Sequence, residues 1–219
     1  MLYEVLHPVV SPLAKAVWRP TIEGLDNVPR TGGLLIASNH LSFIDSVVIP
    51  IIAPRKVVFL AKAEYFDKPL GRAWFGGLGM VPVDRDDTKA AMASLEIALD
   101  VLSRGEAFGI YPEGTRSRDG RLYRGRTGVA ELALTAGVPV VPVGLQGTEN
   151  IQPIGHRFPR RAKVTIRFGE PIDFAGRFEG LPKGKARRQA TDEVMAAIQK
   201  LTGQEPAGLY NEISANPMS

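Results

Sequence analysis

The stretch LLIASNHLSFIDS, residues 34–46, joins an apolar run to a polar turn that holds an ionisable pair. Its first four residues, Leu34–Ala37, have no polar side chain, which is typical of a strand buried on both faces of a parallel sheet. His40 and Asp45 follow at once, around core-forming residues. Open parallel sheets place their reactive groups in the loops that follow strands. The stretch therefore predicts an α/β fold with a functional site at the end of this strand.

The spacing of His40 and Asp45 separates them on any single regular element. On one helix the two side chains would lie about 140° apart, and on one strand they would point to opposite faces. They can meet only across a turn, and Ser42 followed by Asp45 has the pattern of a capping box at the start of a helix. Either Asp45 merely caps the helix and His40 is an ordinary loop residue, or Asp45 holds one imidazole nitrogen and leaves the other as a general base. This stretch alone leaves both interpretations open.

Strand-like and helix-like segments alternate along the rest of the chain. Further strands are expected at residues 56–61, 80–83, 107–111, 138–145 and 162–168, and helices at 42–52, 70–75, 88–103, 127–136 and 185–201. The alternation predicts an α/β fold with a mostly parallel central sheet flanked by helices. The loops after the strands at 34–37, 107–111 and 138–143 are expected to meet at one edge of this sheet. Residues 202–219 are expected to form a flexible C-terminal tail.

The composition narrows the class of protein. The chain has 219 residues, of which 44% are hydrophobic and 23% charged, which indicates a globular protein. It has no cysteine and three histidines, so a thiolate nucleophile is excluded and a metal site is not expected. No nucleotide-triphosphate loop and no convincing dinucleotide fingerprint is present. The net charge of +4 suits an anionic partner, but scattered cations and 7% aromatic residues argue against nucleic acid.

Residues 1–19 are strongly apolar and end with Lys15, Trp18 and Arg19. No stretch of the chain reaches the roughly 18 consecutive apolar residues of a membrane span. The segment either forms a helix that packs on the protein's own core, or lies in the plane of a membrane, because it combines an apolar body with an interfacial aromatic residue and a basic flank.

Three basic residues each follow an apolar run. Lys62 follows residues 57–61, Arg85 follows residues 80–83, and Arg116 lies in the loop after residues 107–111. Each alone is an ordinary surface residue. Because all three lie at the ends of expected strands, and because arginine presents a planar fork that suits phosphate, together they predict a phosphate-binding rim.

Four blocks now stand in order along the chain: Asn39-His40-x-x-x-x-Asp45, a glycine-led apolar run that ends in Arg85, Glu-Gly-Thr-Arg-Ser at 113–117, and Val-Pro-Val-Val-Pro-Val at 138–143. In this order the chain resembles the 1-acylglycerol-3-phosphate (lysophosphatidic acid) acyltransferases, a family of glycerolipid acyltransferases. The match covers about residues 20–175, and four ordered blocks are far more specific than one. Pro82 and Val83 depart from the family, which often has an aromatic residue or isoleucine there, just before Arg85.

The resemblance implies an acyltransferase domain at residues 20–201 and a membrane-docking helical segment at residues 1–19. Trp74-Phe75 is either a second membrane contact or buried in the protein. The reaction would move a fatty acyl group from acyl-CoA or acyl carrier protein to 1-acylglycerol 3-phosphate and give phosphatidic acid. The implied site consists of His40 as base, Asp45 as its partner, Lys62, Arg85 and Arg116 on the phosphate, Glu113, Gly114 and Thr115 around the acceptor, and Pro142 on the acyl-donor side. No cofactor is implied, and the expected location is peripheral or monotopic, on the cytoplasmic face of the cell membrane.

The chemistry of acyl transfer agrees with these residue types. A thioester reacts when an acceptor hydroxyl is deprotonated, the oxyanion is stabilised and the acceptor is held in place. His40 and the three cations meet the first and third needs, and backbone N–H groups near Ser42 are expected to meet the second.

Two alternatives remain open. The acceptor could be glycerol 3-phosphate, another lysophospholipid or a glycolipid. The chain could instead be a serine-type thioesterase or lipid hydrolase, which needs Ser42 or Ser38 within hydrogen-bond reach of His40.

Overall fold

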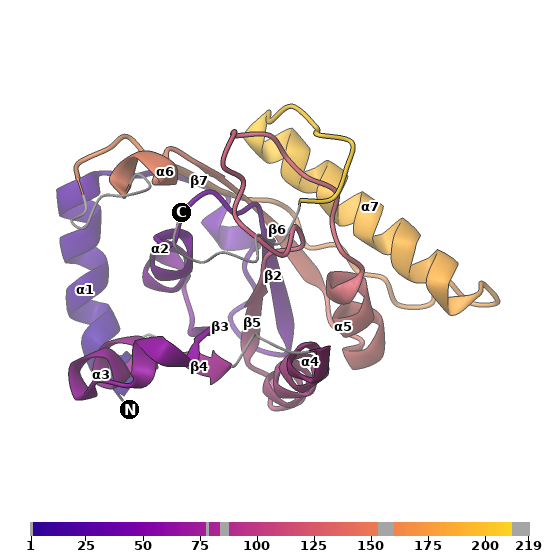
Figure 1. Ribbon diagram of the computed structural model, residues 1–219, viewed down its shortest axis with the longest axis horizontal. Coiled ribbons are helices and arrows are strands. Elements are labelled where there is room, and N and C mark those ends of the chain that lie inside the picture. The colour runs from indigo at the N-terminus through magenta and orange to yellow at the C-terminus, as the bar shows by residue number, and fades with distance from the viewer. Residues whose placement is uncertain (1, 78, 84–87, 153–159, 212–219) are drawn as a thin grey trace.

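The computed structural model describes residues 2–77, 79–83, 88–152 and 160–211 (Figure 1). Within them the sheet consists of β1 (Thr21–Glu23), β2 (Leu34–Ser38), β3 (Val57–Lys62), β4 (Met80–Val83), β5 (Ala107–Ile110), β6 (Val140–Gln146) and β7 (Thr165–Phe168). The helices are α1 (Leu2–Trp18), α2 (Asp45–Ile52), α3 (Pro69–Gly77), α4 (Thr88–Ser103), α5 (Gly128–Ala136), α6 (Thr148–Ile151) and α7 (Lys183–Thr202), and short 3₁₀ turns lie at Leu25–Asn27 and Ala63–Phe66.

The strands lie in the order β1-β7-β6-β2-β5-β3-β4. β2 pairs in parallel with β5 and β6, and β3 pairs in parallel with β4 and β5. β7 pairs antiparallel with β6 and parallel with β1, so β1 and β7 run against the other strands. The predicted α/β fold with a mostly parallel central sheet is confirmed. The short strand β1 and the reversal at β7 have no clear signal in the sequence.

Helices cover both faces of the sheet. Figure 1 shows α1, α2 and α3 on one side and α4, α5 and α7 on the other. Along β2, Leu34 and Ile36 pack in the core that contains α2, whereas Leu35 and Ala37 pack in the core that contains α4, α5 and α7. Because both faces of β2 are covered, its sequence is a continuous apolar run rather than an alternating one.

α2 begins at Asp45, later than the predicted start at Ser42. The Asp45 carboxylate accepts the backbone N–H groups of Leu41 and Ser42 at 2.7 and 2.8 Å, and these bonds hold a turn ahead of the helix. The carboxylate half of the predicted capping box is therefore present. The Ser42 hydroxyl contributes little to the cap, because it lies 3.4 Å from the Ile44 nitrogen.

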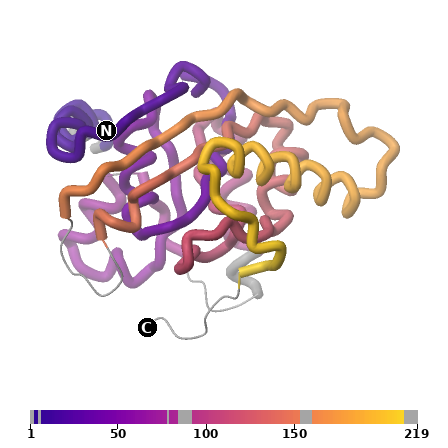
Figure 2. Tube along the Cα trace, turned by 90° about the horizontal axis from the view of Figure 1, so that it is seen from above, coloured from indigo at the N-terminus to yellow at the C-terminus, as the bar shows by residue number. Residues whose placement is uncertain are grey.

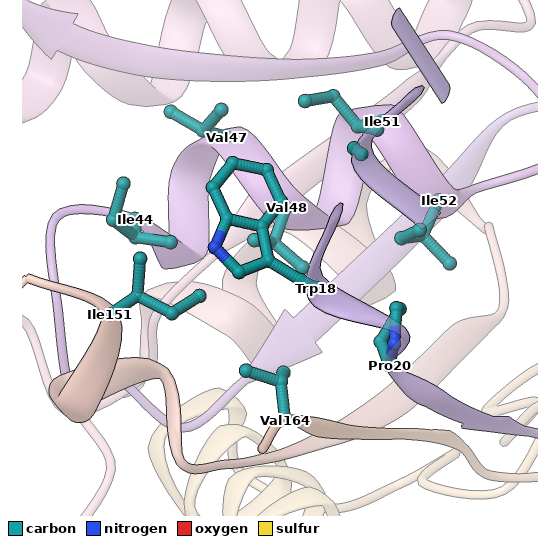
Figure 3. Close-up of a pocket in the computed structure, with 10 residues that line it drawn as sticks. Trp18, Pro20, Ile44, Val47, Val48, Ile51, Ile52, Ile151 and Val164 are labelled. Carbon is teal, nitrogen blue, oxygen red and sulfur yellow. The ribbon is translucent and has the colours of Figure 1, made fainter. Parts of the chain in front are cut away.

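α1 is helical over its whole length although it contains two prolines. Figure 3 shows the Trp18 side chain against α2, among Val47, Val48 and Ile151. The Trp18 indole N–H donates to the carbonyl oxygen of Arg160 at 3.1 Å. The apolar pocket beside Trp18 is small, with a volume of about 30 Å³, and is lined by residues of α1, α2 and the segment around Ile151.

The outer face of α1 does not pack on the protein. Val9, Leu13 and Val17, spaced four residues apart, form an exposed apolar stripe, and Leu13 is 62% exposed. α3 lies next to α1 and exposes Leu70 and Trp74. No described helix is both long enough and apolar enough to cross a bilayer.

Residues 203–211, named here the C-terminal strap, run back across the loop that follows β5 (Figure 2). The Leu122 N–H donates to the carbonyl oxygen of Glu205, and the Ala207 N–H donates to that of Leu122. Arg124 N–H donates to the carbonyl oxygen of Leu209. The expectation of a flexible tail from residue 202 is therefore wrong for the strap, and residues 212–219 lie outside the described residues.

Candidate active site

His40 and Asp45 meet where β2 ends, at the centre of the sheet. His40 Nδ1 lies 2.9 Å from Asp45 Oδ2. The Asp45 side chain is fully buried and the His40 side chain is 14% exposed. Because backbone N–H groups also bind Asp45 Oδ2, the carboxylate is oriented by the turn itself. The structure thus has the contact between Asp45 and Nδ1 that the second interpretation requires, while Asp45 also caps the turn; the role of Nε2 as a general base stays a prediction.

Asn39 attaches this turn to the neighbouring strand. Its Oδ1 accepts the Leu145 N–H at 2.8 Å, and its Nδ2 donates to the Leu145 carbonyl oxygen at 2.9 Å. Nδ2 also donates to Gln204 Oε1 of the C-terminal strap at 2.9 Å. Asn39 is fully buried, so these bonds are not in competition with water. Asn39 therefore sets the position from which the chain turns into His40.

Glu113 connects the His40 turn to the loop after β5. Its Oε1 accepts the His40 backbone N–H at 3.0 Å, and its Oε2 accepts the Tyr123 N–H at 2.9 Å. The side chain is fully buried. Burial raises the pKa of the Glu113 carboxyl to about 7, although the two N–H donors act in the opposite direction. No described arginine forms a hydrogen bond or ion pair with this carboxyl, and Glu113 shapes the site through the backbone groups that it binds.

Arg116 lies on the same loop and faces solvent. The Ser117 N–H donates to the His40 carbonyl oxygen at 2.7 Å, which brings the loop beside the His–Asp pair. Among the described residues, none forms a hydrogen bond or ion pair with the Arg116 side chain. Its guanidinium is therefore available to an anion. The Asn211 side chain of the strap donates to the Arg116 carbonyl oxygen at 3.1 Å and so supports the loop from the other side.

Gly114 and Thr115 form the bend that leads to Arg116. Gly114 has a φ of 80°, which favours glycine, and a Cβ there would lie 2.8 Å from Arg126 Nε. Thr115 is half-buried. Both residues lie on the loop where they were expected.

Two other predicted site residues, Lys62 and Pro142, lie on β3 and β6 and form no hydrogen bond with the His40 side chain. Lys62 ends β3, and its Nζ lies 3.9 Å from Glu64 Oε1. Arg85 lies outside the described residues. Pro142 is buried within β6, where it pairs with Ala37 of β2. Any effect of Pro142 on an acyl donor would act through the position of the strand, and the roles of these three residues stay predictions.

Three of the backbone N–H groups near Ser42 that were expected as oxyanion donors already face other acceptors, and the expectation stays a prediction for the Phe43 N–H. The N–H groups of Leu41 and Ser42 bind the Asp45 carboxylate, and the Ile44 N–H faces the Ser42 hydroxyl. An N–H group that already has an acceptor is not free to stabilise a second negative oxygen. The start of α2 therefore does not provide the oxyanion site through these three groups.

Tyr111 is a site residue that sequence reasoning missed. Its ring stacks on the His40 imidazole with a centroid distance of 3.8 Å and an interplanar angle of 10°. The signal was its place in the chain, since it is an aromatic residue directly before Pro112-Glu113 at the end of a strand.

Within the residues that the structure describes, no group of three or more histidine, aspartate or glutamate side chains is placed to hold a metal ion. No described serine hydroxyl forms a hydrogen bond with the His40 ring. Ser38, which is fully buried, instead donates to the carbonyl oxygen of Asn39 at 3.0 Å. The site thus consists of a buried carboxylate, an imidazole with one free nitrogen and an exposed arginine, a set that fits the transfer of a group to an anionic acceptor.

Comparison with known proteins defines the family. The family model described as Acyltransferase matches residues 19–146, which is more than half of the chain. The chain belongs to this acyltransferase family. The matched segment includes the His40–Asp45 turn and the loop with Glu113 and Arg116.

Named relatives agree with the family. The chain is 33% identical over 139 residues to the chloroplastic 1-acyl-sn-glycerol-3-phosphate acyltransferase BAT2 of Brassica napus, a match that covers 63% of this chain and 40% of the relative. It is 28% identical over 178 residues to 1-acyl-sn-glycerol-3-phosphate acyltransferase of Bacillus subtilis, which covers 80% of this chain and 84% of the relative. The match thus spans well under half of the plant protein and most of the bacterial one.

The fold is similar to that of a crystallised 1-acyl-sn-glycerophosphate (LPA) acyltransferase, PlsC from Thermotoga maritima. The TM-score is 0.68 at 26% sequence identity, and the match covers 92% of this chain and 82% of that one. The α/β fold described above is therefore similar to that of this acyltransferase over most of both chains.

Proposed function

We propose that this protein transfers a fatty acyl group from an acyl-CoA or acyl carrier protein thioester to the free hydroxyl of 1-acylglycerol 3-phosphate, giving phosphatidic acid. The observation that carries the proposal is the 2.9 Å contact between His40 Nδ1 and the buried Asp45 carboxylate, beside a loop that exposes Arg116. The names of the bacterial and plant relatives support this acceptor.

The reaction needs one proton to move in two steps. His40 Nε2 takes the proton of the acceptor hydroxyl as its oxygen attacks the thioester carbonyl carbon. The tetrahedral intermediate then expels the thiolate, and the imidazolium returns the proton to sulfur. Asp45 keeps the imidazole in the tautomer with the proton on Nδ1 and stabilises the imidazolium between the steps. No covalent enzyme intermediate forms.

Arg116 is proposed to bind the phosphate of the acceptor. A planar guanidinium without a partner in the described residues presents two parallel N–H groups to phosphate oxygens. Lys62 and Arg85 are proposed as further cations on the same group. This assignment favours phosphate-bearing acceptors over glycolipids, and glycerol 3-phosphate stays the nearest alternative because it carries the same phosphate.

The outer stripe of α1 and the exposed residues of α3 are proposed to lie in the surface of the membrane that supplies the acceptor. Leu70 on α3 is 84% exposed, and burying such a side chain in lipid contributes about 1.5–3 kcal/mol. Phe43, from the His40 turn, contacts Tyr65 and Phe75 through edge-on ring contacts. This aromatic cluster joins α3 to the active-site turn, so a membrane bound at α3 would lie close to His40. The membrane side, proposed to be cytoplasmic, agrees with where acyl-CoA and acyl carrier protein occur.

A hydrolase is the competing class, and the acceptor dependence of the reaction separates the two. Thiol release from palmitoyl-CoA, and separately from palmitoyl-acyl carrier protein, is measured with 1-acylglycerol 3-phosphate, with glycerol 3-phosphate and without acceptor. The proposal expects release only with the lysolipid. Release without acceptor that Ser42→Ala abolishes would identify a serine hydrolase, and release only with glycerol 3-phosphate would replace the proposed acceptor.

A further inference from the structure

Alternation along β5 places Gly109 and Tyr111 on the same face of the sheet. Ala107 and Tyr111 pack in the core that contains α2, whereas Phe108 and Ile110 pack in the opposite core. Gly109 falls between Ala107 and Tyr111 on the face that leads to His40. A glycine in a strand often marks a place where another group approaches the backbone closely.

The group that approaches Gly109 is Phe59 of β3. A Cβ on Gly109 would lie 2.1 Å from Phe59 Cζ, a distance that no real side chain tolerates. The neighbouring residues Val58 and Phe108 are paired in the sheet, so Phe59 and Gly109 come next along the two strands. The missing side chain of Gly109 therefore lets the buried Phe59 ring lie across β5.

Phe59 is the first of three stacked rings, and the His40 imidazole is the last. Its ring centroid lies 5.4 Å from that of Tyr111, with 28° between the planes. The Tyr111 ring in turn lies 3.8 Å from the His40 imidazole and is nearly parallel to it. Tyr111 is also held at its far end, because its hydroxyl is hydrogen-bonded to Ser46 Oγ of α2 at 2.9 Å.

From these contacts we infer that Phe59 and Tyr111 form an aromatic column that sets the plane of the His40 imidazole. Tyr111 is the positioning residue, and Gly109 leaves the space that the Phe59 ring occupies. Asp45 fixes one nitrogen of the ring, but a single hydrogen bond leaves the ring free to tilt about the bond axis. A parallel ring stacked on the imidazole removes this tilt and points Nε2 in one direction. Proton transfer in acyl transfer depends on this direction, because reacting atoms must approach within about 3–3.5 Å in line.

The inference rests on the proposed function, in which His40 Nε2 is the base. It predicts that losing the ring of Tyr111 lowers kcat and leaves substrate binding intact. For Tyr111→Leu we expect kcat to fall about 10- to 100-fold with KM for both substrates within about twofold, because alignment is lost and binding is not. Tyr111→Phe keeps the stacked ring and loses the hydroxyl that is hydrogen-bonded to Ser46, so it should retain kcat within about threefold of the parent enzyme.

The matched control is Phe108→Leu. Phe108 is a buried aromatic residue on the same strand, but it faces the opposite core. Its substitution should lower the melting temperature with no loss of kcat. Tyr111→Met fills a similar volume without a ring, and it replaces Tyr111→Leu if thermal unfolding shows that the leucine variant does not fold.

A second readout does not depend on activity. In ¹⁵N and ¹H NMR spectra of His40, the parent protein and Tyr111→Phe should show one sharp Nδ1–H signal, and Tyr111→Leu should show a broadened or doubled signal. Gly109→Ala, which displaces Phe59, should give the same broadening.

The results separate this inference from the proposed function. In one result, His40→Ala is inactive while Tyr111→Leu keeps full kcat and a single sharp signal. That result would overturn the positioning role of Tyr111 and leave His40 as the general base. Equal losses of kcat in Tyr111→Leu, Tyr111→Phe and Phe108→Leu would also overturn it, because they would reflect general packing. If His40→Ala is fully active, the proposed function itself fails.

Discussion

Glu113 Oε1 accepts the backbone N–H of His40 at 3.0 Å, a contact between residues 73 positions apart in the chain. The other oxygen of Glu113 binds the Tyr123 N–H. A fully buried carboxyl whose two oxygens both bind backbone cannot reach a substrate without breaking one of these bonds. Glu113 thus holds the His40 turn and the Arg116 loop in register, and its charge state is coupled to the stability of this region.

The first prediction concerns pH and stability. Burial raises the pKa of the Glu113 carboxyl from its ordinary 4.5 to about 7. Because the folded chain then holds a proton that the unfolded chain has already released, Glu113 makes the fold less stable as pH rises through this window. The difference between 4.5 and about 7 corresponds to at most about 3 kcal/mol at 1.36 kcal/mol per pH unit.

This effect is measured by urea unfolding of the parent protein and Glu113→Gln between about pH 4.5 and about pH 8. Glutamine lacks the titrating group, although its amide loses one backbone bond and lowers stability at every pH. The free energy of unfolding of the parent should therefore fall relative to that of the variant as pH rises. A constant difference, or one that grows with pH, would contradict the raised pKa.

The second prediction tests the Asp45 contact. Asp45→Asn keeps an oxygen for the N–H groups of Leu41 and Ser42 and removes the negative charge beside His40. We expect kcat to fall about 100-fold or more, since the imidazolium loses its partner, with little change in KM. Steady-state kinetics, with circular dichroism to confirm folding, provide the measurement. An Asp45→Asn enzyme with parental kcat would reduce Asp45 to a helix cap.

The third prediction concerns Arg116. Arg116→Ala should raise KM for a phosphate-bearing acceptor about 10- to 100-fold, because one or two charge-assisted hydrogen bonds to the phosphate are lost. KM for the acyl donor should not change. Arg121→Ala is the control, because Arg121 is exposed on the same loop but is paired with Asp119 at 2.7 Å. Equal effects of both substitutions would mean that the loop contributes only general positive charge.

The fourth prediction concerns membrane docking. Leu13→Glu on α1 and Leu70→Glu on α3 should each lower binding to vesicles of phosphatidylglycerol and phosphatidylethanolamine about tenfold or more, because each removes an apolar side chain from lipid and adds a charge. Flotation of the protein with vesicles measures this. Met92→Glu changes a residue that is 66% exposed on α4, on the opposite side of the sheet, and should not matter. If Met92→Glu weakens vesicle binding as strongly as Leu13→Glu does, the proposal that the protein docks through α1 and α3 is contradicted.

Much of this structure was predictable from local patterns. α4 begins and ends at the predicted residues because Ala91, Leu95 and Leu102 keep helical spacing up to Arg104-Gly105. β2 was predictable because a parallel strand covered on both faces is apolar throughout. The turn between His40 and Asp45 was predictable from the residues Ser42 and Asp45, whereas the sequence left the contact itself open.

The parts that were not predictable depend on partners distant in the chain. The strap folds because Leu122, Arg124 and Asn39 supply its hydrogen-bond partners, and nothing in residues 203–211 announces them. Glu113 looked like a charge for solvent or substrate, and its burial follows from the two backbone groups that meet above β5. Gly109 carries no signal of its own in the sequence, because its reason is the Phe59 ring that lies across it from β3.

The most direct test of the central claim is the rate of phosphatidic acid formation, followed by mass spectrometry, from palmitoyl-CoA or palmitoyl-acyl carrier protein and 1-acylglycerol 3-phosphate, by the parent enzyme and His40→Gln. Glutamine approximates the size of histidine and cannot act as a base near neutral pH. The account predicts phosphatidic acid from the parent enzyme. For His40→Gln it predicts a rate at least about 100-fold lower, with a melting temperature equal to that of the parent. Equal rates for the two proteins, or no phosphatidic acid with either donor, would contradict it.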